Sequence, residues 1–311
     1  MSGQNPLISI CIPSYKRYEH LIRLLNSITI QSFKNYEIII SDDSPGDEVF
    51  KIFQQYQHQL PIAYFHNNPA LGTPANWNSA IRHAKGSWIK LMHDDDCFVE
   101  SSALQKFAKA IDENPDADFI FSAYRNRHEH STEDMPFVSR IRWKALNNSS
   151  ASLLSKNIIG PPSTTLIKKS IHTTYDERLQ WLVDIDFYIR VLTASKFCYI
   201  RERLIDIGIN EEQVTNKSSR NPAIEIPEFF MVYEKLSLQQ QQNIFVYDAA
   251  WRLLRNFRIT HPNQIFELGY RSKPPEHILK MIQWQRKFPA AVLRFGPASK
   301  SLMFLHALLN R

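Results

Sequence analysis

Short apolar runs alternate with amphipathic segments through the first 123 residues. The runs are rich in β-branched or aromatic residues and end at turn-forming residues, which is typical of buried strands; they are 7–12, 37–41, 61–65, 88–92 and 118–123. Between them, apolar residues recur at helical spacing, as at Leu21, Leu24, Leu25 and Ile28. This alternation predicts an α/β fold, Rossmann-like, with a mainly parallel sheet and flanking helices.

Beyond residue 123 the pattern changes. Residues 124–160 are polar, 161–167 return to an extended apolar pattern, and Phe187, Val191 and Leu192 mark the apolar face of a helix. Residues 223–260 are expected to be helical, and the remaining tail is interrupted by prolines. The sequence therefore predicts an α/β domain over 1–218, divided near residue 123, and a helical C-terminal region over 219–311.

Composition places the chain among ordinary globular proteins. It has 311 residues, of which 43% are hydrophobic and 22% charged, enough for one large domain or two. Three cysteines lie far apart and form no disulfide or zinc pattern, which fits a reducing compartment. No signal segment and no apolar run of about 20 residues is visible. We therefore expect a soluble, cytoplasmic chain.

The net charge of +6 is concentrated at the C-terminal end. From residue 251 onward there are eleven Lys and Arg against Glu267 and Glu276, whereas the first 250 residues hold 26 basic and 29 acidic residues. The tail ends in an apolar segment, 299–310, flanked by Lys300 and Arg311. It is a candidate to bind an anionic membrane surface, or to pack on the first domain or a dimer partner. No nucleic-acid-binding motif is present, so no nucleic acid partner is expected.

Three consecutive carboxylates, Asp94, Asp95 and Asp96, follow the apolar run 88–92. In open α/β sheets ligands bind at the carboxyl ends of the strands, and adjacent acids repel one another unless a cation or donors compensate. Divalent cations such as Mg²⁺ use one or two carboxylates together with substrate phosphates. The alternative is a solvated acidic turn. Polar loops at 13–17 and 42–46 also follow strands, which favours a nucleotide or phosphate site at this edge.

A second acidic pair, Asp184 and Asp186, begins the helix near residue 187. Carboxylates are favourable at the positive end of a helix dipole, so either residue could simply cap the helix. The functional interpretation is a general base at the edge of a cleft. The residues themselves leave both readings open.

Together these motifs resemble a known family. Residues 12–17, 40–44, 72–78, 86–89 and 93–96 are similar in order and spacing to the nucleotide-sugar domain of family 2 inverting glycosyltransferases of bacterial surface-polysaccharide type, which have the GT-A fold. Residues 183–190 look like the family's second acidic motif, with Val183 where Glu is usual. Asn210 stands where many relatives have a histidine that completes the metal site.

The resemblance implies a role for each matching residue. Residues 1–123 would form the nucleotide-sugar half and 124–218 the acceptor half. Asp96 would be the main ligand of Mn²⁺ or Mg²⁺, in a DXD motif, and Asp184 the catalytic base. The implied nucleotide-sugar-binding residues are Pro13, Tyr15, Arg17, Asp43, Asn76, Asp94 and Asp95. Asp43 would accept a hydrogen bond from the base, and the Tyr15 ring would lie against it.

The resemblance also implies an activity. The chain would be a metal-dependent, hexosyltransferase-like enzyme that moves a sugar from a nucleotide diphosphate sugar, by default UDP-linked, to a glycan or lipid-linked acceptor in polysaccharide or lipopolysaccharide biosynthesis. It would then be cytoplasmic, peripheral on the inner face of the cell membrane. The alternative is a non-catalytic nucleotide- or glycan-binding module on the same fold. No G-x-G-x-x-G or P-loop motif occurs, which disfavours dinucleotide enzymes and P-loop NTPases.

Overall fold

The computed structural model describes residues 5–209 and 220–310, and the chain divides into two compact units. The first unit comprises residues 1–139, 158–178 and 190–213, and the second comprises 140–157, 179–189 and 214–311. Two segments that the sequence assigns to the acceptor half, 140–157 and 179–189, thus group with the C-terminal helices. The domain boundary expected between residues 218 and 219 falls outside the described residues, so it stays a prediction.

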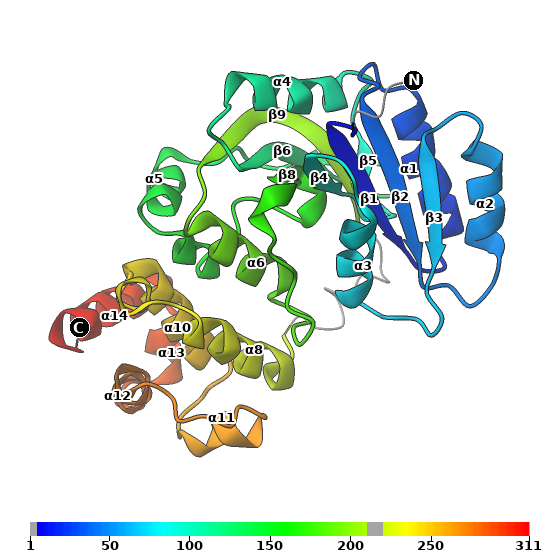
Figure 1. The fold of residues 1–311 in the computed structure, drawn as a ribbon. Coiled ribbons are helices and arrows are strands. Elements are labelled where there is room, and N and C mark those ends of the chain that lie inside the picture. Colours follow the sequence, from blue (N-terminus) through cyan, green and yellow to red (C-terminus); the bar gives the residue numbers. More distant parts are fainter. Residues whose placement is uncertain (1–4, 210–219, 311) are drawn as a thin grey trace. The chain divides into compact units, whose positions relative to one another are not determined.

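A nine-stranded mixed sheet forms the first unit (Figure 1). The strands are β1 (Ile8–Ser14), β2 (Tyr36–Asp42), β3 (Ile62–His66), β4 (Trp88–Leu91), β5 (Cys97–Phe98), β6 (Phe119–Arg127), β7 (Thr132–Asp134), β8 (Thr165–Lys168) and β9 (Phe197–Gly208). Their order is β3-β2-β1-β4-β8-β6-β9-β5, with β7 paired to β6. Strands β1 to β4 pair in parallel, as do β6 and β9, whereas β8 and β5 run antiparallel to their neighbours. The expected mainly parallel sheet is confirmed.

Helices cover both faces of this sheet. They are α1 (Tyr18–Thr29), α2 (Glu48–Tyr56), α3 (Ala75–His83) and α4 (Ala103–Glu113). Alternate residues of β1, Ile8, Ile10 and Ile12, are fully buried in one cluster with the apolar stripes of α1, α2 and α4. Helix α3 contacts β1, β2 and β4 and lies on the other side of the sheet in Figure 1. Burial of both faces explains why these strands are almost continuously apolar.

The last strand, β9, is not predicted from the sequence. Its middle contains Arg201, Glu202 and Arg203, which hide any strand pattern. Here the pairing with β6 shifts register between Ser122 and Tyr124, so the strand bends and its charged side chains reach solvent. Only the end of β9, from Leu204 to Gly208, is buried throughout, and that end lies next to the acidic turn at residues 94–96.

The second unit is helical. Its elements are α5 (Arg140–Asn148), the 3₁₀ turn η1 (Ser150–Leu154), the start of α6 (Val183–Leu192), α8 (Pro222–Glu234), α9 (Leu238–Gln241), α10 (Ile244–Asn256), α11 (Asn263–Glu267), α12 (Glu276–Gln285), α13 (Ala290–Arg294) and α14 (Gly296–Asn310). Local capping fixes several starts: the side chains of Asn221, Ser237 and Asn243 each accept a backbone N–H from the helix that follows.

The expected C-terminal helical extension is confirmed. A helix was not expected at 140–148, where the sequence is polar, because α5 buries only Ala145 and Leu146. No helix in the described part of the chain has both the length and the apolarity that a bilayer crossing requires.

Candidate active site

The three carboxylates Asp94, Asp95 and Asp96 form a turn between β4 and β5, at the carboxyl end of β4. Their residues are only 6%, 6% and 2% exposed. The reading of these acids as a solvated turn is therefore wrong. Three buried like charges need compensation, and the structure supplies part of it.

Arg17 compensates two of the three acids. Its guanidinium donates to Asp95 Oδ2 at 2.6 Å and lies 3.6 Å from Asp94 Oδ1. The backbone N–H of Tyr15 donates to Asp94 Oδ2 at 3.3 Å. Burial, followed by the charge of Asp95, raises the pKa of Asp94 to about 7, while Arg17 opposes that rise. The loop after β1 and the turn after β4 are thus joined by charge, as expected for one site at one sheet edge.

Asp96 has a different environment. Its Oδ1 accepts the backbone N–H of Gly208 at 2.9 Å, at the end of β9. Its Oδ2 is buried and has no hydrogen-bond partner among the described residues. Burial, then the neighbouring Asp95, raises the pKa of Asp96 well above its ordinary value. An unpartnered carboxylate oxygen in this position is what a metal ligand requires.

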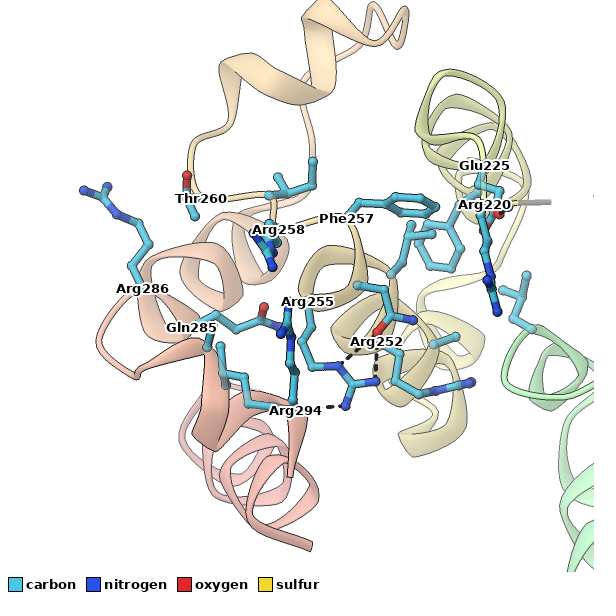
Figure 2. Close-up of a pocket in the computed structure, with 18 of the residues that line it drawn as sticks. Arg220, Glu225, Arg252, Arg255, Phe257, Arg258, Thr260, Gln285, Arg286 and Arg294 are labelled. Atoms are coloured by element: carbon cyan, nitrogen blue, oxygen red, sulfur yellow. Dashed lines mark hydrogen bonds between the residues drawn. The ribbon is translucent and has the colours of Figure 1, made fainter. Parts of the chain in front are cut away.

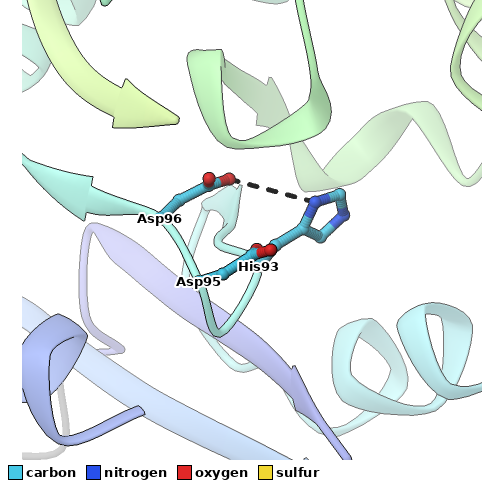
Figure 3. Close-up of side chains that lie close together, drawn as sticks. All are labelled: His93, Asp95 and Asp96. Atoms are coloured by element: carbon cyan, nitrogen blue, oxygen red, sulfur yellow. Dashed lines mark ion pairs between the residues drawn. The ribbon is translucent and has the colours of Figure 1, made fainter. Parts of the chain in front are cut away.

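His93 completes a candidate metal site. One ligand atom from each of His93, Asp95 and Asp96 can be chosen so that all three lie within 4.8 Å of one another (Figure 3). His93 Nδ1 is 3.9 Å from Asp96 Oδ2, and its Nε2 is buried without a partner. Burial lowers the pKa of His93 to about 4, which keeps the ring neutral, the form that binds metals. Carboxylates with one imidazole suit a divalent cation, so these residues fit the expected Mn²⁺ or Mg²⁺.

Buried contacts from residues 163–165 and from the end of β9 fix the shape of the turn. The Lys90 ammonium, fully buried in β4, donates to the carbonyls of Ser163 and Thr165. Ser163 Oγ in turn accepts the backbone N–H of His93 at 2.9 Å. At Gly208 an added Cβ would lie 2.4 Å from the carbonyl oxygen of Asp95, so only glycine lets β9 approach this closely.

The residues expected to bind the nucleotide gather at the same edge. Pro13 is buried at the end of β1, and Tyr15, 52% exposed, follows it. Asn76, at the start of α3, is buried and donates to the carbonyl of Ser14 at 3.4 Å. Asp43, at the end of β2, is 5% exposed.

The Asp43 carboxylate already holds a loop of the protein. It accepts from Asn67 Nδ2 at 2.9 Å and from the backbone N–H groups of Leu71 and Gly72 at 3.1 and 2.8 Å. Gly72 has φ +75°, a conformation that favours glycine. Asp43 therefore shapes the loop at 67–72 in this structure, and its role toward a base stays a prediction.

Asp184 belongs to the second unit, in the first turn of α6. Its Oδ2 accepts from Asn157 Nδ2 at 2.9 Å and its Oδ1 from the N–H of Ile185 at 2.8 Å. Burial raises the pKa of Asp184 to about 6, and these hydrogen bonds oppose the rise. Asp186 differs, because it is 1% exposed and forms an ion pair with Lys235 at 2.6 Å. Asp186 is thus a structural residue, whereas the hydrogen bonds described for Asp184 come from neutral donors.

Glu228, in α8, fixes the chain that leads into α6. Its buried carboxylate accepts three successive backbone N–H groups, from Gln180, Trp181 and Leu182, at 2.7, 2.8 and 2.9 Å. These donors directly precede the turn that holds Asp184. Sequence reasoning missed both Glu228 and His93. Asn210, expected near the metal site, lies outside the described residues.

Comparison with known proteins identifies the family and the fold of the chain. The profile of glycosyl transferase family 2 matches residues 9–172. An uncharacterized glycosyltransferase of Haemophilus influenzae is 28% identical over 194 residues, which cover 61% of this chain and 64% of the relative. The match thus spans less than two thirds of that relative's length.

Two solved structures share the fold. TarS residues 1–349 of S. aureus, in complex with UDP-GlcNAc, superpose with a TM-score of 0.68 at 15% identity, covering 97% of this chain and 90% of that one. The mannosyltransferase PcManGT of Pyrobaculum calidifontis, in complex with GDP-Man and Mn²⁺, superposes with a TM-score of 0.58 at 11% identity, covering 99% and 88%. At these identities the likeness establishes the fold.

Proposed function

The chain belongs to glycosyl transferase family 2, and on that premise we propose that it moves a sugar from a nucleotide diphosphate sugar to a hydroxyl group, with inversion. UDP is the expected nucleotide. The acceptor is a glycan or lipid-linked glycan of a polysaccharide or lipopolysaccharide pathway. A nucleotide-sugar donor is supported by the TarS and PcManGT complexes, which hold UDP-GlcNAc and GDP-Man.

One observation supports this proposal above the others. The buried turn after β4 presents Asp96 Oδ2 without a hydrogen-bond partner, with His93 Nδ1 3.9 Å away and Asp95 beside it. Buried polar groups are normally hydrogen-bonded, so a buried carboxylate oxygen without such a bond, next to two other possible ligands, favours a bound cation. Mn²⁺, which PcManGT holds in its complex, is therefore the cofactor we propose for His93, Asp95 and Asp96.

The protein's own residues divide the chemistry. A divalent cation, when bound, stabilises the negative charge that develops on the departing diphosphate. Arg17 holds Asp94 and Asp95 in place, and Tyr15 and Asn76 lie where a nucleotide at the ends of β1 and β4 would meet them. Because the bound cation would compensate the charge of the departing diphosphate, this leaving group needs no proton from the enzyme.

Asp184 is proposed as the general base that removes the proton from the attacking hydroxyl. A base is most effective when its pKa lies near the working pH, and burial raises that of Asp184 to about 6. The Asn157 amide and the Ile185 N–H leave lone pairs on both carboxylate oxygens for the acceptor hydroxyl. One carboxylate for the proton, and separate ones for the cation, suit a single displacement without a covalent sugar intermediate.

The C-terminal helices are proposed to meet an anionic membrane surface, which would make the protein peripheral on the inner face of the cell membrane. Large apolar side chains of α14 and of the residue before it are solvent-exposed, among them Phe295 at 63%, Leu308 at 82% and Leu309 at 63%. Lys300 is exposed on the same helix. Exposed apolar residues next to basic ones are typical of helices that lie on membranes.

The test is metal-dependent turnover. With Mn²⁺ the purified protein is expected to hydrolyse or transfer from one member of a panel of UDP, GDP, CDP and dTDP sugars. Asp96→Asn, which removes the charge at the unpartnered oxygen, is expected to lower that rate by about 10³-fold. Asp112→Asn makes the same change at an exposed position of α4 and should leave the rate unaltered.

Binding of nucleotide without turnover of any donor would instead favour the non-catalytic module. Turnover that is indifferent to chelation and to Asp96→Asn would overturn the metal site and leave the family assignment standing.

A further inference from the structure

An arginine-lined cavity lies within the helical unit, and its lining includes Trp181 and Leu182, in the segment that leads to Asp184. It has a volume of about 900 Å³ (Figure 2). Six arginines from four segments line it: Arg220, Arg252, Arg255, Arg258, Arg286 and Arg294. Glu225 is the one acid among the described residues that line it, and its carboxylate accepts the backbone N–H of Arg220. The cavity therefore has a large excess of positive charge.

Most of these arginines lack an acidic partner within the described chain. Arg252 pairs with Asp248 at 3.0 Å. Arg255 donates to neutral oxygens, namely Asn256 Oδ1, Ser299 Oγ and the carbonyl of Leu293. Burial, and then the charge of Arg252, lowers the pKa of Arg255. An anion inside the cavity would offset this repulsion.

The remaining arginines are exposed and available. Arg258, Arg286 and Arg294 form no side-chain hydrogen bond or ion pair with any residue in 5–209 or 220–310. In Figure 2, Arg286 extends away from the other labelled side chains, whereas Arg258 and Arg294 stand beside Arg255. Planar guanidinium groups in such numbers match phosphate oxygens, which they bind through two parallel hydrogen bonds.

Much of the remaining lining is apolar. It includes Phe229, Phe257, Ile259, Phe288 and Leu293. A site for inorganic phosphate or for a free sugar phosphate would not need apolar side chains in its lining. An apolar wall beside arginines suits a molecule that joins a phosphate to a hydrophobic chain.

We propose that this cavity binds the phosphate or diphosphate group of an amphiphile, a phosphate ester whose organic part is apolar. If the proposed glycosyl transfer holds, this group is the anchor of a lipid-linked acceptor, so that part of the inference rests on the proposed function. A membrane phospholipid headgroup offers the same chemistry, and the experiment separates these two sources.

The experiment measures binding without metal or donor, by isothermal titration calorimetry with geranyl diphosphate as the probe. The wild-type protein should bind it at least tenfold more tightly than inorganic pyrophosphate. The double variant R258Q/R294Q should lose at least tenfold in affinity, because two phosphate contacts disappear while no described contact of the fold is removed. Lys273→Gln removes an exposed charge of the same unit outside the cavity and should stay within twofold of wild type.

Equal affinity of R258Q/R294Q and wild type would overturn the proposal, as would equal affinity for pyrophosphate and geranyl diphosphate. Tighter binding of dihexanoyl phosphatidylglycerol than of geranyl diphosphate would support the site and assign it to a headgroup. Asp96→Asn should leave this binding intact while it stops turnover, so failure of the cavity and failure of the proposed reaction are distinguishable.

Discussion

The acidic turn after β4 and the first turn of α6 both hold carboxylates whose pKa values are raised by burial, but their surroundings differ. In the acidic turn, Asp94, Asp95 and Asp96 share one buried site, with Arg17 paired to the first two. In α6, Asp184 meets two neutral donors, and the neighbouring acid Asp186 is neutralised by Lys235.

The difference indicates two kinds of chemistry. Crowded carboxylates with an excess of negative charge are stabilised by a cation, and Asp96 Oδ2 has no hydrogen-bond partner in the described chain. A single carboxylate with a pKa of about 6 is ionised at neutral pH, yet still basic enough to accept a proton. The following predictions separate a cation site from a base.

The largest effect is expected at Asp184. Asp184→Asn should lower the rate of transfer by about 10³-fold, because a general base contributes roughly 10²–10⁴. Stabilisation by Mn²⁺ should not change, since the cation is assigned to the other carboxylates. Steady-state kinetics with saturating donor measure the rate, and Asp116→Asn on the surface is the control. Full activity of Asp184→Asn would remove it from the mechanism.

The second effect concerns His93. In thermal denaturation, Mn²⁺ at a hundredfold excess over its Kd should stabilise the wild-type protein by about 2.7 kcal/mol. His93→Ala should reduce this stabilisation to below about 1 kcal/mol, because one ligand of the proposed site is lost. His58→Ala, at an exposed position of the same unit, should respond like wild type. An unchanged response of His93→Ala to Mn²⁺ would mean that the cation binds elsewhere.

The third effect is a pH dependence of the rate. Asp184 must be ionised to accept a proton, and its pKa is about 6. The rate should therefore be level above pH 7 and fall by about tenfold per pH unit below pH 6. Saturating Mn²⁺ at each pH ensures that the fall in rate does not come from loss of the bound cation. A rate that stays constant from pH 7 to pH 5 would contradict the assignment of the base.

Sequence patterns predicted β1 to β4, β6 and the position of the acidic turn, because regular burial on two faces produces regular apolar runs, but they missed the two-residue strand β5. They could not predict His93 as a ligand. A histidine before three acids has no distinctive spacing, and its role depends on the burial of its ring beside Trp77.

Contacts between distant segments could not be predicted from the sequence either. Glu228 meets the N–H groups of residues 180–182 across nearly 50 residues, and Arg252 donates to the carbonyl of Ser155 across 97. Such contacts place 140–157 and 179–189 with the C-terminal helices. The arginine-lined cavity is a product of the same folding, since its charges come from separate helices that only the tertiary structure gathers.

The smallest effect is on stability, and it tests the environment of Asp184 without any substrate. Its pKa in the folded protein is about 6, above its ordinary value of 3.8, so the ionised form is disfavoured by folding. Above pH 6 the wild-type protein bears this cost, and as the pH falls toward 4 the cost disappears.

Asp184→Asn does not titrate, and its side chain can keep the bond to Ile185 N–H. Loss of the Asn157 bond acts equally at every pH, so the stability of Asp184→Asn relative to wild type should be about 1 kcal/mol greater at pH 8 than near pH 4, a figure that allows for the partial exposure of the carboxylate. Urea denaturation at both pH values measures the difference. If the relative stability were the same at pH 4 and pH 8, the buried charge would not contribute to it. A relative gain in stability at high pH with a loss of activity at one residue is what a buried base produces, and a capping residue would show the opposite sign.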